Sequence, residues 1–319
     1  MTTYIIRRLI QAFIVLVIIT LLVFFVMRLL PGDPLTIYLA DSANIQAMPQ
    51  SQLEVLRHQF GLDLPLMVQY EHWVIGILHG NFGTSIFYHN DVGTLMAQRF
   101  PVTTYLGVMA LLLGAIVGSG LGLLAAIRRG TWVDNVITPL TYVGVTIPVF
   151  WLGILMIYLF GLKLHWLPIS GYTSPFTDFW MSIKQAVMPV FCLSVFSLAA
   201  NARQMRSAML EVVTQDYIRT AWSKGLSERA IIMTHALKNS LIPVITLIGM
   251  GVGIIFGGSV LVETVFAIPG VGRLMVNSIF AQDYVVVQAI TFVIAIIVLV
   301  VNLLVDLSYS WFDPRIRYG

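Results

Sequence analysis

Apolar runs of about 20 residues recur along this chain, and each is long enough to cross a bilayer as one α-helix. A helix satisfies its own backbone hydrogen bonds in lipid, and the alternating pattern of a membrane barrel is absent from the sequence. Composition agrees: 58% of residues are hydrophobic and 10% are charged, whereas a soluble domain carries about 25% charged residues. The sequence therefore predicts an all-α integral membrane protein.

The hydropathy pattern predicts about six spans, at roughly 9–30, 103–127, 135–160, 185–201, 241–262 and 285–307. Pro148 lies inside the third run and predicts a kink or break there. Most of the 18 Lys and Arg residues fall on one side if both termini are cytoplasmic, as the positive-inside rule expects. The sequence thus predicts a multi-pass protein with both ends in the cytoplasm.

Four regions follow from this pattern. Residues 1–34 form an N-terminal transmembrane helix, and residues 35–100, which are mixed and polar, form a small insert outside the cytoplasm. Residues 101–307 form a transmembrane core, in which the segment from Glu263 to Tyr284 is an outer loop, and residues 308–319 form a cytoplasmic tail. Five of the six histidines fall in the predicted outer segments with no metal-binding spacing, so no metal site is expected.

Charged residues are scarce except in the segment 203–240, which separates two apolar runs. Its composition predicts one helix over Met205 to Lys224, followed by Gly225 in the left-handed conformation past the helix end. Ser227 is the expected N-cap of a second helix that runs through Pro243 into the next span. The segment is either a docking surface for a soluble partner or a solvated loop that links two spans.

Two sets of glycines recur at four-residue intervals within predicted spans, which places each set on one helix face. Close packing against another helix is the favoured interpretation, and a glycine-rich lining of a pore is the alternative. The six residues are Gly114, Gly118, Gly122, Gly249, Gly253 and Gly257.

The predicted spans contain almost no ionisable residues, although such residues normally mark ion or proton paths. The sequence contains no zinc-hydrolase or serine-hydrolase motif and no phosphate-binding loop for ATP. These absences disfavour a proton-coupled carrier and a membrane enzyme, and no catalytic residue is assigned. If the chain moves a solute uphill, another subunit must supply the energy.

The segment DYIRTAWSKGLSERAIIMTHALKNSLIP, Asp216 to Pro243, resembles the cytoplasmic motif of permease subunits in bacterial ATP-binding-cassette (ABC) importers. It is most similar to the peptide/nickel group, which transports dipeptides and oligopeptides. The N-terminal run ending in PGDP resembles the same group, as do QFGLDLP, GNFGTS and VFAIPGVGRL. The general motif begins Glu-Ala-Ala, whereas these positions are Arg219, Thr220 and Ala221 here.

The resemblance implies a type I importer permease (MetI-like) fold with an insert after the first span, in the bacterial cytoplasmic (inner) membrane. It implies a heterodimer with a second homologous permease, two ABC ATPase subunits that bind ATP and Mg²⁺, and an external substrate-binding protein. No cofactor is expected on this chain, and no nucleic acid is expected as a partner. The residues expected to couple to the ATPases are Glu211, Asp216, Arg219, Thr220, Ala221, Lys224, Gly225 and Leu226.

The substrate stays open at this point. Di- or oligopeptides are the first expectation, and nickel complexes, glutathione and oligosaccharides are the alternatives within the same importer type. A passive channel or a homo-oligomeric membrane scaffold is a separate hypothesis. Purification of the tagged chain distinguishes these hypotheses, because an importer retains ATPase subunits and a channel does not.

Overall fold

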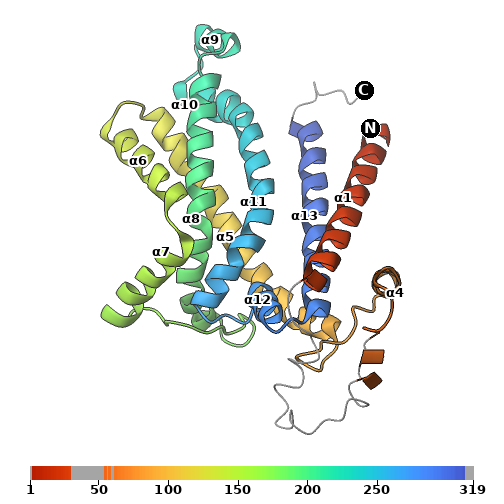
Figure 1. The fold of residues 1–319 in the computed structure, drawn as a ribbon. Coiled ribbons are helices and arrows are strands. Elements are labelled where there is room, and N and C mark those ends of the chain that lie inside the picture. Colours follow the sequence, from red (N-terminus) through yellow and green to blue (C-terminus); the bar gives the residue numbers. More distant parts are fainter. Residues whose placement is uncertain (1, 30–53, 56, 59–60, 313–319) are drawn as a thin grey trace. The chain divides into compact units, whose positions relative to one another are not determined.

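The computed structural model describes residues 2–29, 54–55, 57–58 and 61–312 (Figure 1). The first part of the predicted insert, up to residue 53, and the last residues of the predicted tail lie outside the described residues. The chain divides into two compact units, Met1–Val102 with Gly270–Leu299, and Thr103–Pro269 with Val300–Gly319. The described residues are almost entirely helical, with one isolated β-bridge between Thr84 and Asp91.

Among the described residues, five helices are long and apolar enough to cross a membrane, and a bent pair makes up to six. The prediction of about six spans is therefore confirmed. Four of the five are α1 (Thr2–Leu29), α5 (Val92–Ile127), α8 (Phe179–Val212) and α13 (Tyr284–Phe312). The fifth is one continuous helix with three labels: α10 (Glu228–Ala230), η3 (Ile231–Ala236) and α11 (Leu237–Val265).

The third predicted span is the bent pair. It consists of α6 (Trp132–Thr146) and of α7 (Val149–Met156), which continues as η2 (Ile157–Lys163), and the helix axis bends by 106° between the two halves. Ile147 and Pro148 have extended backbone angles at the joint. Proline lacks a backbone N–H and disfavours helical angles in the residue before it, so the break predicted at Pro148 is confirmed.

Two helices differ from the predicted elements. The helix expected to begin near residue 103 begins at Val92 and includes Pro101, so residue 100, the expected end of the insert, lies inside α5. Asp91 starts the helix early, because its carboxylate accepts hydrogen bonds from the backbone N–H and the hydroxyl of Thr94. The predicted outer loop from Glu263 to Tyr284 also contains a helix, α12 (Val271–Phe280).

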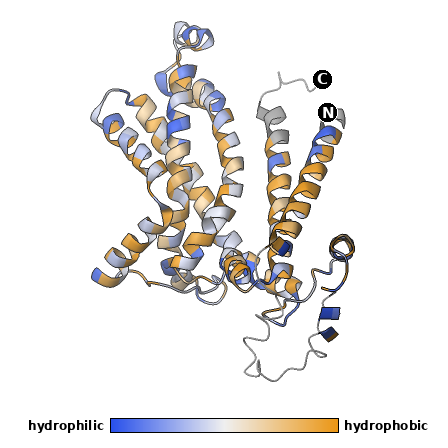
Figure 2. Ribbon diagram, in the orientation of Figure 1, coloured by the Kyte–Doolittle hydropathy of each residue, from blue (hydrophilic) through white to orange (hydrophobic). Residues whose placement is uncertain are grey.

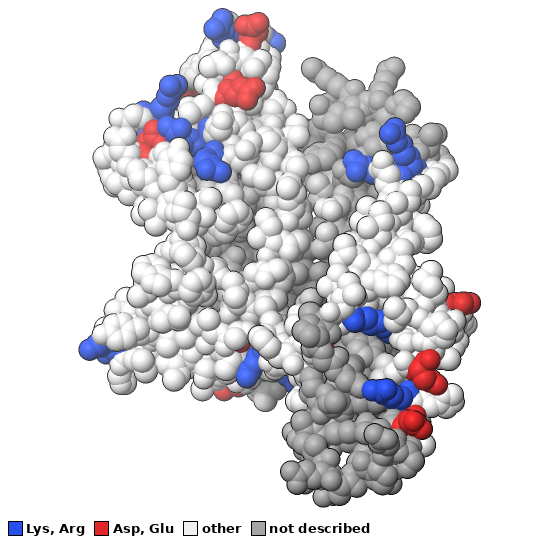
Figure 3. Space-filling view, in the orientation of Figure 1, with Lys and Arg blue, Asp and Glu red and all other residues white. Residues whose placement is uncertain are grey.

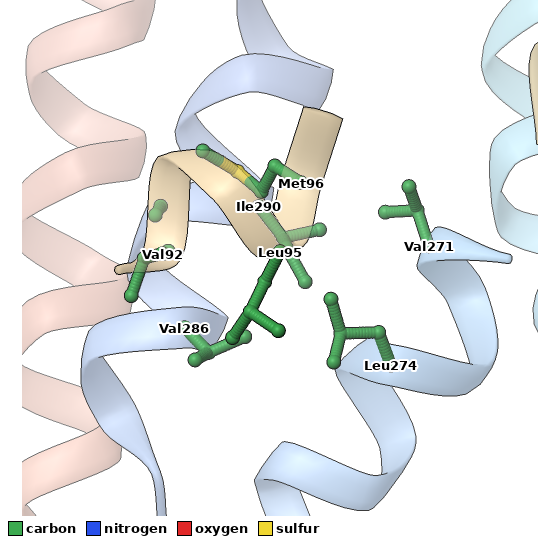
Figure 4. Packing of buried hydrophobic residues seen from close by; sticks show 8 residues of the cluster. Val92, Leu95, Met96, Val271, Leu274, Val286 and Ile290 are labelled. Atoms are coloured by element: carbon green, nitrogen blue, oxygen red, sulfur yellow. The ribbon is translucent and has the colours of Figure 1, made fainter. Parts of the chain in front are cut away.

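The first unit has its own hydrophobic core. Figure 4 shows Leu95 of α5 near Leu274 of α12, with Met96 of α5 and Val286 and Ile290 of α13 in the same cluster. The early turns of α5 therefore pack inside this unit, which explains why the helix extends beyond the predicted span. In the same unit, α4 (Leu66–Leu78) packs its aromatic residues against α1, as described below.

In the second unit, α8 packs against α6, α7 and α11. Figure 2 shows apolar residues along the long helices and more hydrophilic residues in the short helix α9 (Asp216–Ser223). Many large apolar side chains on the spans are exposed, among them Ile116, Leu140 and Ile154. Such faces contact lipid or another chain in a membrane protein rather than water.

Candidate functional site

The polar segment between α8 and α11 does not form the single helix predicted over Met205 to Lys224. That prediction is wrong: α8 ends at Val212, and α9 begins at Asp216 after a short turn. The hydroxyl of Thr214 donates to the carbonyl of Glu211 (2.7 Å), and Gln215 has extended backbone angles. A threonine side chain that bonds a nearby carbonyl offers the backbone an alternative to the helix, a local signal that propensity alone underweighted.

The joint after α9 follows the sequence prediction. Gly225 has a φ of +76°, the left-handed region that glycine adopts without strain. A Cβ atom at this position would meet nothing within 4 Å, so the backbone angle, and not space, requires glycine. Ser227 caps the next helix, because its hydroxyl accepts a bond from the N–H of Ala230 (3.4 Å). Both predictions are confirmed.

One face of α9 is anchored in a hydrophobic cluster. Ile218 is 1% exposed and Ala221 is 6% exposed, and both join residues of α8, η3 and α11 in this cluster, namely Met205, Met209, Ile231, Ala236 and Val244. The hydroxyl of Tyr217 also accepts a hydrogen bond from the Asn239 amide of α11 (2.8 Å). The short helix α9 is therefore held by α8 and by the helix that continues into α11. It projects beyond the ends of these two helices (Figure 1).

The opposite face of α9 is polar and open. The side chains of Asp216 and Arg219 are 98% and 75% exposed, and they form a loose ion pair (3.6 Å). In the second unit, charged residues gather at this end, and a broad surface without charge follows (Figure 3). Seven of the eight residues expected to couple to the ATPases are exposed: Glu211, Asp216, Arg219, Thr220, Lys224, Gly225 and Leu226.

Ala221 is the exception, because it faces the hydrophobic cluster and is not available to a partner. Sequence reasoning also missed Trp222, which is 50% exposed on α9. An exposed tryptophan next to exposed charges is a frequent anchor of protein interfaces. A residue four positions after Ile218 is expected on the same helix face as Ile218, so helical spacing alone did not predict that Trp222 is exposed.

A buried ion pair ties α6 to α8 near the same end of the second unit. Arg206 binds both carboxylate oxygens of Asp134, at 2.7 and 2.8 Å. The same carboxylate accepts bonds from the N–H of Gly130 (3.1 Å) and the hydroxyl of Thr138 (2.9 Å), and Asp134 is 4% exposed. Sequence analysis did not identify this pair, although an acidic residue in the first turn of a helix is a recognisable signal.

The glycines of α5 lie against α8. A Cβ atom at Gly118 would lie 2.5 Å from the carbonyl oxygen of Leu198, and one at Gly122 would overlap the carbonyl of Ala202. The amide of Asn201 donates to the carbonyl of Gly114 across the same contact (3.2 Å). This face lets two helix backbones approach closely, the arrangement that small-residue stripes permit in membranes.

The second glycine set does not behave uniformly. A Cβ at Gly249 would overlap the side chain of Val305, whereas one at Gly257 would meet nothing within 4 Å. Gly257 is exposed and Gly253 is partly buried. Within α11, the set therefore combines one close contact with an open position that is free for a partner or a solute.

Two carboxylates with no exposed surface flank the segment that contains α12. In the second unit, Glu263 accepts a hydrogen bond from the hydroxyl of Thr103 (2.6 Å). In the first unit, Asp283 accepts bonds from the hydroxyl of Ser85 (2.5 Å) and the backbone N–H of Phe87 (3.2 Å). Among the described residues, no three His, Cys, Asp or Glu side chains gather as metal ligands.

Comparison with known proteins identifies the family to which this chain belongs. Residues 118–318 match the model of the family described as binding-protein-dependent transport system inner membrane component, and residues 1–107 match the model of its N-terminal region. The chain belongs to this family of ABC importer permeases. The permease is 40% identical to a probable peptide ABC transporter permease protein of Sinorhizobium fredii, over all of both chains. It is also 40% identical to the dipeptide transport system permease protein DppB of Lactococcus lactis, over 99% of this chain and all of that one.

The permease has the fold of a solved importer subunit. A chain of the MetNI methionine ABC transporter, in an inward-facing conformation, matches 69% of the permease and is itself covered to 96%, with a TM-score of 0.53 and 18% identity. This likeness confirms the predicted type I importer fold. Permeases of this family generally work with ATPase subunits and a substrate-binding protein. The permease is a multi-pass protein of the inner membrane.

Proposed function

We propose that this permease forms half of the translocation path of an ATP-driven importer of di- or oligopeptides, and that α9 is its contact with an ATPase subunit. The observation that carries the proposal is the two-faced construction of α9: a buried apolar face on the cluster and an exposed polar face around Arg219 and Thr220. A solvated linker has no need of such an anchor. A docking element does, because the force applied to its outer face has to reach the spans.

The contacts of α9 indicate how motion would pass to the spans. Ile218 and Ala221 contact the ends of α8 and of the helix that continues into α11, so a push on α9 displaces both as a rigid body. The pair between Asp134 and Arg206 ties α6 to α8 and would carry α6 along. In this proposal α9 and both termini face the cytoplasm, ATP and Mg²⁺ bind to two ATPase subunits, and this chain binds no cofactor.

The second half of the path would come from a homologous permease, and the exposed Gly257 face of α11 is available for that contact or for the path itself. The peptide substrate is proposed from the names of the 40%-identical relatives. A wide path with few fixed charges suits peptides of varied sequence. It also suits nickel complexes, glutathione or oligosaccharides, which are the other outcomes of a substrate test.

The docking proposal is tested with Arg219→Glu, which reverses an exposed charge without disturbing the buried face. The matched control is Arg129→Glu, the same change at an exposed position between α5 and α6. We expect Arg219→Glu to reduce co-purification of the ATPase subunits and substrate uptake by about tenfold, and the control to leave both near wild type. Equal ATPase retention in the two variants would remove the case for α9 as the docking element.

A second variant separates docking from transmission. Gly225→Val places a β-branched residue at a φ of +76°, which costs about 1–2 kcal/mol and displaces the end of α9. We expect the ATPases to remain bound while uptake per ATP hydrolysed falls. Gly120→Val on α5, where a Cβ meets nothing within 4 Å, is the control. Uptake down a gradient by a reconstituted preparation of this chain alone would instead support the passive channel.

A further inference from the structure

The first unit contains a partly open cavity of about 240 Å³ between α1, α4, the start of α13 and the loop around Gly83. Its lining includes Arg28, Gln69, Trp73 and Gln288. The aromatic side of the cavity is tightly packed, because Trp73 contacts Phe24 of α1 and Phe292 of α13. No residue of the described lining is acidic.

The unsatisfied polar atoms of this cavity are hydrogen-bond donors. The indole Nε1 of Trp73 and the amide Nε2 of Gln288 are buried without a hydrogen-bond partner in the part of the chain that the structure describes. Gln288 as a whole is 2% exposed, so its amide has no access to bulk solvent. Buried donors without partners are rare in folded proteins, and such a pair beside one cavity points to a bound acceptor.

A cation lies beside these donors. The guanidinium of Arg28 donates through Nε and Nη2 to the amide oxygen of Gln69, at 3.1 and 2.9 Å, and through Nη1 to the carbonyl of Phe24. It also lies over the rings of Phe24 and Tyr284. These contacts fix the charge in place but do not neutralise it, because each partner of Arg28 among the described residues is uncharged. The cavity is therefore electropositive and supplies several donors, which suits an oxyanion.

The position of the cavity indicates the source of the oxyanion. Arg28 is the last residue but one of the apolar span Ile6–Leu29, so it lies at the boundary between hydrocarbon and water. The adjoining face of α1 is open and apolar, with Leu22 57% and Val26 47% exposed. A phospholipid that places its phosphate at Arg28 would lay its acyl chains along this face.

We propose that the cavity binds the phosphate of a membrane phospholipid, with Arg28 supplying charge and the Trp73 and Gln288 donors supplying hydrogen bonds. The bound lipid would connect α1 and α4 to the start of α13 at the membrane boundary. Water is the competing occupant. The cavity would hold several water molecules, at about 30 Å³ each, and water also accepts hydrogen bonds from both donors.

The test uses the complex purified with the subunits that accompany this chain. Trp73→Phe keeps the aromatic packing and removes one donor, and Gln288→Leu removes the other with little change in volume. Gln185→Leu is the matched control, because its buried Oε1 also lacks a partner in the described structure, but Gln185 lies in α8 of the second unit. Native mass spectrometry counts retained phospholipid, and thermal unfolding is measured with added phosphatidylglycerol or inorganic phosphate.

We expect wild type and Gln185→Leu to retain phospholipid and to gain thermal stability from it, and the two cavity variants to bind it about tenfold more weakly. Inorganic phosphate could stabilise wild type as much as phosphatidylglycerol does, without stabilising the cavity variants. In that case the site binds an oxyanion, but takes it from solution and not from a lipid. Retention and stabilisation that are the same in all four proteins would overturn the proposal, since the cavity would then hold only water.

Discussion

Replacing Gly118 by alanine is expected to destabilise the contact between α5 and α8, although alanine favours a helix. The added Cβ would lie 2.5 Å from the carbonyl oxygen of Leu198 and 3.0 Å from its Cα, whereas ordinary contacts begin at 3.4 Å. Both opposing atoms belong to the backbone and cannot rotate away. The two helices must therefore separate locally by about 0.9 Å, a gap that forfeits a large part of the dispersion energy at this contact.

The loss of stability in Gly118→Ala is best measured relative to a second variant. Gly120→Ala makes the same change two residues away, on an exposed face where a Cβ meets nothing within 4 Å. Both variants gain up to about 1 kcal/mol of helix propensity, so their difference isolates the overpacking, which costs about 1–3 kcal/mol. The separation also stretches the bond from Asn201 to the carbonyl of Gly114.

The assay is the thermal unfolding of the purified complex, with both variants heated at the same rate because membrane complexes unfold irreversibly. Gly118→Ala should unfold several degrees below Gly120→Ala, and Gly120→Ala should match or exceed wild type. Equal unfolding temperatures for the two variants would refute the reasoning. They would mean that α5 and α8 do not approach as closely in the membrane as the structure indicates.

Two further predictions concern charged pairs. Asp134→Ala leaves the charge of Arg206 without its buried partner and should lower stability by about 3–5 kcal/mol. Replacing both Asp134 and Arg206 by apolar residues of similar size should recover much of the lost stability in a thermal unfolding assay. Outside the spans, the hydrogen bond from His58 to Asp63 (2.7 Å) raises the pKa of His58 above 6.5 and lowers the pKa of Asp63 below 3.8. The stabilisation from protonated His58 is thus complete below pH 6.5, and it disappears as the pH rises through the raised pKa of His58. The stabilisation from ionised Asp63 disappears as the pH falls through the lowered pKa of Asp63. NMR titration should find the His58 pKa above 6.5 and back at that value in Asp63→Asn; an unchanged pKa in the variant contradicts the pairing.

The membrane architecture was largely predictable because it follows from local rules. A run of apolar residues has to become a helix in lipid whatever its neighbours are, and Pro148 breaks a helix through its own ring. Gly225 and Ser227 act on the backbone within a few residues of themselves, so their roles as helix end and helix cap were also readable from sequence. The spacing of Gly118 and its neighbours identified a close-packing face without identifying the helix that occupies it.

Tertiary structure decided the rest. The burial of Ala221 beside the exposed Arg219 depends on the cluster that the long helices form around α9. Arg206 and Asp134 lie 72 residues apart, Thr103 and Glu263 lie 160 apart, and Ser85 and Asp283 lie 198 apart. Each of these residues reads as an isolated polar group in the sequence. Hydrophobicity and backbone geometry are properties of a residue and its near neighbours, whereas the pairing of buried polar groups depends on which segments meet in three dimensions.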